Sequence, residues 1–152
     1  MRPYLLLVPA LLACTKAEEA PADSAASTPA PAAAPVAITD ADVAGTWTGT
    51  AKAQGTDSTF AHFSITCGGG TCRVTTTESP KDTVPSTYVL AADSSTGTSS
   101  PYSEPAMKGV KMVDHWVAKP SGNQISGHGW VTLADKPDSV VARYTFTGTR
   151  TP

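Results

Sequence analysis

The feature of this sequence that most restricts its fold is the spacing of its strand-forming residues. From Ile38 to the C-terminus, Thr, Val, Trp, Tyr and Phe occur in short runs that are interrupted by Gly, Pro, Asp and Ser. No stretch repeats its apolar residues every 3.6 positions, as an amphipathic helix requires. The pattern is typical of an all-β fold, with room for one helical turn, over residues 39–44, ahead of the first strand.

Eight strands are predicted in this part of the chain. The connections between them are mostly short, which implies that consecutive strands pair antiparallel in an up-and-down meander. Eight such strands can close into a small barrel, and closure removes the exposed edges of the sheet. The predicted strands span residues 44–52, 58–66, 72–78, 85–92, 95–100, 110–119, 124–133 and 139–150.

Alternation along these strands separates an inner face from an outer face. We expect Gly127 and Gly129 to make room for Trp116 across the hairpin that joins their strands. The predicted inner face consists of Gly45, Trp47, Gly49 and Ala51; Ala61, Phe63 and Ile65; Met112, Asp114, Trp116 and Ala118; Ile125, Gly127, Gly129, Val131 and Leu133; and Val140, Ala142, Tyr144, Phe146 and Gly148.

The N-terminus has the features of an export signal. Arg2 supplies a positive charge, and residues 5–13 form an apolar stretch of nine residues, whereas a membrane-spanning helix needs roughly 20. The segment Leu11-Leu12-Ala13-Cys14 resembles the lipobox of bacterial lipoproteins. This resemblance implies that residues 1–13 are a signal peptide and that Cys14 carries a diacylglycerol. The alternative is an ordinary secretory signal with a Cys there by chance.

The lipobox resemblance also implies a location. The protein would be anchored in the cell envelope through the lipid on Cys14, so a membrane is its expected partner. Thr15, rather than Asp, follows this Cys, which in that family favours the outer membrane when a cell has two. Residues 14–37 then form an Ala- and Pro-rich tether that cannot bury a core, and residues 38–152 form the barrel domain.

A second resemblance arises at the start of the first strand. Gly45-Thr46-Trp47 is similar to the Gly-x-Trp opening of lipocalins. In that family the Trp plugs one end of the barrel and an Arg from the last strand lies over it, a role that Arg150 matches. The stretch 102–150 also resembles small uncharacterised bacterial lipoproteins that end in a Gly-Thr-Arg strand.

The lipocalin resemblance and the inner lining together predict a ligand site. Trp116, Tyr144 and Phe146 are expected to line the interior beside glycines that leave space. Asp114 has inward parity, and a buried carboxylate needs compensation. It either pairs with a Lys or Arg near the barrel mouth or marks a polar point in a ligand cavity.

The remaining cysteines and histidines suggest simple roles. Cys67 and Cys72 flank a predicted four-residue hairpin loop, 68–71, so we expect them to form a structural disulfide; a redox or metal pair is the alternative. His115 and His128 are predicted to face each other on the outer surface. They would then be solvated side chains or, alternatively, a pair of metal ligands.

Composition excludes some functions and leaves three open. A net charge of -2 without Lys or Arg clusters disfavours a nucleic-acid partner. No nucleophile elbow or acid pair is present, so no enzyme activity, metal or cofactor is expected. The barrel is predicted to bind a small apolar or amphipathic ligand. Alternatively, loop 100–109, with Tyr102 and Met107, binds another envelope protein, or the domain is purely structural.

Overall fold

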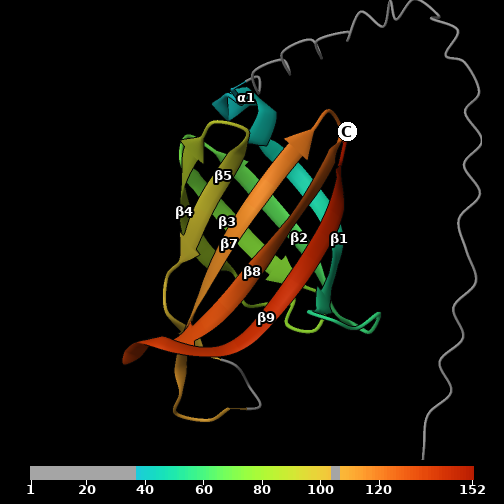
Figure 1. Cartoon of the computed structure of the whole chain (residues 1–152). Coiled ribbons are helices and arrows are strands. Elements are labelled where there is room, and N and C mark those ends of the chain that lie inside the picture. The colour runs from blue at the N-terminus through green and yellow to red at the C-terminus, as the bar shows by residue number, and fades with distance from the viewer. Residues whose placement is uncertain (1–36, 104–106) are drawn as a thin grey trace, which may run out of the picture. The chain divides into compact units, whose positions relative to one another are not determined.

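The computed structural model describes residues 37–103 and 107–152, which form an antiparallel β-barrel (Figure 1). Eight strands pair in sequence order, from β1 to β5 and from β7 to β9, and the pairings β5–β7 and β9–β1 close the ring. The elements are α1 (Asp40–Val43), β1 (Gly45–Ala53), β2 (Thr59–Gly68), β3 (Thr71–Thr76), β4 (Val84–Ala91), β5 (Ser94–Ser99), β6 (Tyr102–Ser103), β7 (Lys111–Ser121), β8 (Gln124–Leu133) and β9 (Lys136–Arg150).

The predicted all-β meander is confirmed, and each of the eight predicted strands is present with ends shifted by a few residues. The one helical turn expected at residues 39–44 is α1. The short strand β6 was not predicted, because two residues carry no alternation that a sequence pattern could detect. It pairs only with Met112 and Lys111 at the start of β7.

Tight turns set the register of the hairpins. Gly69 and Gly70 have φ angles of 59° and 76°, and Gly68 pairs with Thr71. The β2–β3 loop therefore has two residues rather than the four expected, and only residues that tolerate positive φ suit its two central positions. Ala92, in the β4–β5 turn, also has a positive φ of 44°, which is unfavourable for a residue with a Cβ.

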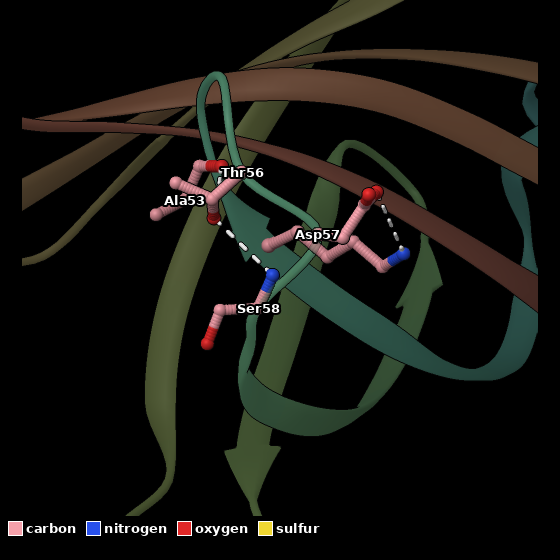
Figure 2. Close-up of polar contacts among 5 residues, drawn as sticks. Ala53, Thr56, Asp57 and Ser58 are labelled. Carbon is pink, nitrogen blue, oxygen red and sulfur yellow. Dashed lines mark hydrogen bonds and ion pairs between the residues drawn. The ribbon is translucent and has the colours of Figure 1, made fainter.

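The β1–β2 connection is held by its own side chains (Figure 2). The backbone N–H and the hydroxyl of Thr56 both donate to the carbonyl of Ala53, each over 3.1 Å. The Thr56 hydroxyl in turn accepts a hydrogen bond from the Ser58 N–H over 3.3 Å. These local bonds stabilise the turn, together with a hydrogen bond from the Gln54 N–H to the Arg143 carbonyl of β9 over 3.0 Å.

The barrel interior is built from aromatic rings packed directly on glycine backbone. A Cβ on Gly97 would lie 2.1 Å from the Trp116 ring, and one on Gly129 would lie 2.3 Å from Tyr144. Gly127 gives the same room to Phe146. The prediction that Gly127 and Gly129 accommodate Trp116 was therefore wrong. Gly129 pairs with Trp116 on one side and Tyr144 on the other, but Tyr144 covers it, whereas Trp116 packs on Gly97 of β5.

The predicted inner face is largely correct, except at the start of β9. The buried apolar residues include Trp47, Ala51, Met112, Trp116, Ala118 and Ile125. Val140 and Ala142 are exposed. Ala142 keeps the regular register opposite Val131, whereas the β8–β9 register shifts immediately beyond it, and such a bulge breaks the alternation that placed Val140 inward.

Candidate functional site

One end of the barrel, which we call the plugged end, is sealed by Trp47, Arg150 and α1. Trp47 has 0% exposure, and its indole N–H donates to the Val43 carbonyl over 2.9 Å. The Arg150 guanidinium carbon lies 4.5 Å from the centre of the Trp47 ring, a cation–π distance. The expected contact between Arg150 and Trp47 is thus present.

The same end is tied to α1 by polar bonds. Arg150 Nη2 donates to the Asp42 carbonyl over 2.7 Å. The Asp40 carboxylate accepts hydrogen bonds from the Tyr88 hydroxyl and from the Gly69 N–H, and the Tyr88 bond is the main reason that the pKa of Asp40 is lowered. These bonds fasten α1 over the plugged end of the barrel.

The opposite end, which we call the far end, holds a carboxylate–phenol pair. The Tyr144 hydroxyl on β9 lies 2.9 Å from each oxygen of Asp114 on β7. Both residues point inward, as predicted, and both keep some solvent exposure. Met112 on the far-end side of Asp114, and Trp116 and Ala118 on its plugged-end side, are all buried, so Asp114 lies between buried residues of β7.

Burial dominates the electrostatics of this pair. Desolvation raises the pKa of the Asp114 carboxyl to about 7, although the Tyr144 hydroxyl and the His115 N–H partly offset it. Desolvation, together with the charge of Asp114, also raises the pKa of Tyr144 well above its usual value. Of the two alternatives for Asp114, pairing with a Lys or Arg is not observed: the ion pairs among the described residues join other carboxylates. A neutral phenol takes its place.

Two serines extend the polar cluster. The Ser99 hydroxyl on β5 accepts a hydrogen bond from the Asp114 N–H over 2.9 Å. Ser86 on β4 lies directly opposite Ser99, and its hydroxyl is buried with no hydrogen-bond partner. Neither serine was predicted, because inner and outer faces were not assigned to these two strands; their alternation would have placed both inward.

An aromatic residue that the sequence also did not single out borders the pair. Phe60 packs edge-on against Tyr144, with ring centres 6.0 Å apart, and is 54% exposed. It sits where the β1–β2 register shifts between Ala51 and Lys52. Strand alternation alone would therefore have misplaced it.

Trp116 and Phe146, the other two residues predicted to line a ligand site, pack against neighbouring residues in the barrel interior. Trp116 packs on Gly97 and lies 6.4 Å from Tyr88 between ring centres. Phe146 packs on Gly127 and edge-on to Phe63 at 6.0 Å. Two concave regions of about 430 and 680 Å³ lie over the outer face, around residues such as Thr48 and Thr50. Neither region is lined by Asp114 or Tyr144, so the candidate site rests on the geometry of that pair.

The predicted opposition of His115 and His128 was wrong. The β7–β8 turn consists of Gly122 and Asn123, which pairs His115 with Trp130 and His128 with Val117. Trp130 stacks on His115 with ring centres 5.3 Å apart. Within residues 37–103 and 107–152, no three His, Cys, Asp or Glu side chains gather in a way that could hold a metal ion.

The cysteine prediction is confirmed: Cys67 and Cys72 form a disulfide, with an S–S distance of 2.03 Å. They are directly opposed across β2 and β3. The disulfide closes the hairpin at the plugged end, next to the Gly69 N–H that binds Asp40. The disulfide therefore links β2 and β3 covalently next to their turn.

Several predictions fall outside the described residues. These are the signal peptide 1–13, the lipidated Cys14, nearly all of the tether 14–37 and, in the loop 100–109, residues 104–106. Tyr102 of that loop belongs to β6, and Met107 is exposed. Where the structure does describe the chain, it contains no helix whose length and apolar character would let it span a bilayer.

Comparison with known proteins gives no relative. No protein-family model matches the chain, and no curated protein or solved structure does. The candidate site therefore rests on its own geometry.

Proposed function

We propose that the protein is a lipid-anchored binding protein of the cell envelope, whose barrel binds a small amphipathic ligand at its far end. The anchor is the lipid expected on Cys14. The binding residues are Asp114 and Tyr144, with Phe60 at the border. The proposal contains no catalytic step and no cofactor.

One observation carries this proposal: a largely buried carboxylate that only neutral groups satisfy. Removing a charge from water is costly unless a partner compensates it, and the chain supplies the Asp114 carboxyl with a phenol and one backbone N–H, that of His115. A small number of polar groups beside aromatic side chains, here Asp114 and Tyr144 beside Phe60, is a feature of small-molecule sites. The plugged end, by contrast, is filled by Trp47 and Arg150.

Ligand binding can be tested with protein purified from its own host. Native mass spectrometry of the full chain should detect a co-purifying small molecule. In the Tyr144→Phe variant, which removes only the hydroxyl, occupancy should fall. The matched control is Thr145→Val, which removes a hydroxyl from the exposed outer face of the same strand. Equal occupancy in both variants would place the ligand elsewhere, and repeated absence of any ligand would refute the proposal.

The anchor needs a separate test. Mass spectrometry of the mature N-terminus should show a chain that begins at Cys14 and carries acyl groups. The Cys14→Ser variant should leave the membrane fraction. A mature chain that starts at Met1, or is cleaved elsewhere with an unmodified Cys14, would contradict the envelope anchor without affecting the binding site.

A further inference from the structure

We propose that the ligand of the far-end site carries a positively charged amine, for which Asp114 is the counter-ion. This inference rests on the proposed binding function and specifies the chemistry of its ligand. It follows from the charge, the unused hydrogen-bonding capacity and the aromatic border of the site.

The first argument is that, among the described residues, no cationic side chain neutralises Asp114. The three ion pairs of the described residues join Lys52 to Asp57, His62 to Glu78, and Lys119 to Asp93. In this part of the chain no Lys, Arg or His pairs with Asp114. A cationic ligand would supply the missing charge, whereas an anionic ligand would add repulsion in a poorly solvated site.

The second argument is the number of hydrogen bonds left to make. An ionised carboxylate has about four acceptor positions. One Tyr144 hydroxyl proton, shared between two oxygens at 2.9 Å, and the His115 N–H do not fill them. A primary ammonium carries three N–H donors, and such charge-assisted bonds are stronger than neutral ones.

The third argument is the set of nearby hydroxyls. The Ser86 hydroxyl is buried without a partner, and an unmet hydrogen bond at a buried polar group is unfavourable. Ser86 lies opposite Ser99, whose hydroxyl already contacts the Asp114 backbone. These hydroxyl oxygens are acceptors for the ammonium protons that the carboxylate does not take.

The fourth argument is the aromatic border. Phe60 and Tyr144 pack edge-on at the far end, and Phe60 remains more than half exposed. Aromatic faces attract cations, and the exposed ring offers apolar surface to a hydrocarbon chain. A cationic head with a short apolar tail therefore fits the site better than a purely apolar molecule.

The experiment compares three probes of similar size: hexylammonium, 1-hexanol and hexanoate. Binding to the full chain is followed by NMR titration at pH 8, with shifts mapped to residues around Asp114 and Tyr144. We expect hexylammonium to bind at least about tenfold more tightly than 1-hexanol, and hexanoate to bind more weakly than both. In Asp114→Asn, which keeps the side-chain shape, this preference should disappear while 1-hexanol binding is retained.

The matched control is Asp93→Asn, which removes the exposed carboxylate that pairs with Lys119 and should leave all three affinities unchanged. Equal affinity of the intact protein for hexylammonium and 1-hexanol would overturn the amine inference but leave the binding site standing. The same holds if Asp114→Asn keeps the preference. If no probe shifts the far-end residues, both the inference and the proposed function fail.

Discussion

Replacing Asp114 by Asn should change how the stability of the protein depends on pH. In the folded state the pKa of this carboxyl is raised from 3.8 to about 7, mainly by burial. Between these values the folded protein keeps a proton that the unfolded chain has released. The stability contributed by this group is therefore full below about pH 4 and is lost as the pH rises through 7.

The size of the effect follows from the same two values. At about 1.4 kcal/mol for each pH unit, a rise from 3.8 to about 7 amounts to about 4 kcal/mol. The Asn side chain does not titrate, so the variant escapes this loss. Relative to Asp114→Asn, the wild type should thus lose up to about 4 kcal/mol of unfolding free energy between pH 4 and pH 8.

The assay is urea unfolding followed by tryptophan fluorescence at intervals from pH 4 to pH 8. Only the difference between the two proteins is used, so that other titrating groups cancel. Asp93→Asn serves as a control for the direction of the effect. A hydrogen bond from Lys119 lowers the pKa of Asp93, so the stability that Asp93 contributes is lost as the pH falls, the opposite of the behaviour expected for Asp114. A flat difference between wild type and Asp114→Asn across this range would refute the assignment of a desolvated carboxylate.

Three further predictions concern stability and can be checked by the same unfolding assay. Gly97→Ala should lower the unfolding free energy by at least about 2 kcal/mol, because the added Cβ would overlap the Trp116 ring. The control Gly68→Ala, whose Cβ would have its nearest neighbour 3.9 Å away, should have little effect. Equal losses of stability in the two variants would contradict the packing of Trp116 on Gly97. Replacing Cys67 and Cys72 by Ser should cost about 2 kcal/mol by the chain-entropy relation, and an unchanged midpoint under non-reducing conditions would contradict it. Ala92→Gly should stabilise by about 0.5–1 kcal/mol, because it relieves the positive φ at this turn; a loss would show that the turn is not strained.

The strands could be predicted because they depend on local pattern, and alternation placed Trp47, Trp116 and Tyr144 inward. The contact of Arg150 with Trp47 was implied by the resemblance to lipocalins. The predicted pairing of His115 with His128 was wrong because strand register depends on which residues form the turn. In the structure the two turn residues are Gly122 and Asn123, which shifts the β7–β8 register by two residues relative to the predicted one. One residue of difference in a turn is too small for composition to resolve.

The candidate site was harder to predict for a different reason. The inward position of Asp114 follows from alternation, but its partner lies 30 residues away on another strand. Gly129 has an aromatic residue opposite it on each neighbouring strand, Trp116 and Tyr144. Which of the two rings packs on this glycine depends on the side-chain rotamers, which the sequence pattern does not specify. Packing between strands decides such choices, and single-strand patterns do not contain that information.

The pairing of β1 with β9 has a consequence for the order of folding. Trp47 and Arg150, which face each other in this pairing, are about 100 residues apart, whereas the other barrel pairings link strands that follow one another closely along the chain. Ring closure therefore carries the largest entropic cost and awaits synthesis of the final 15-residue strand. A chain truncated before β9 would keep two open strand edges, which invite pairing between molecules. A stop codon between β8 and β9 should thus produce aggregates rather than a shorter closed barrel.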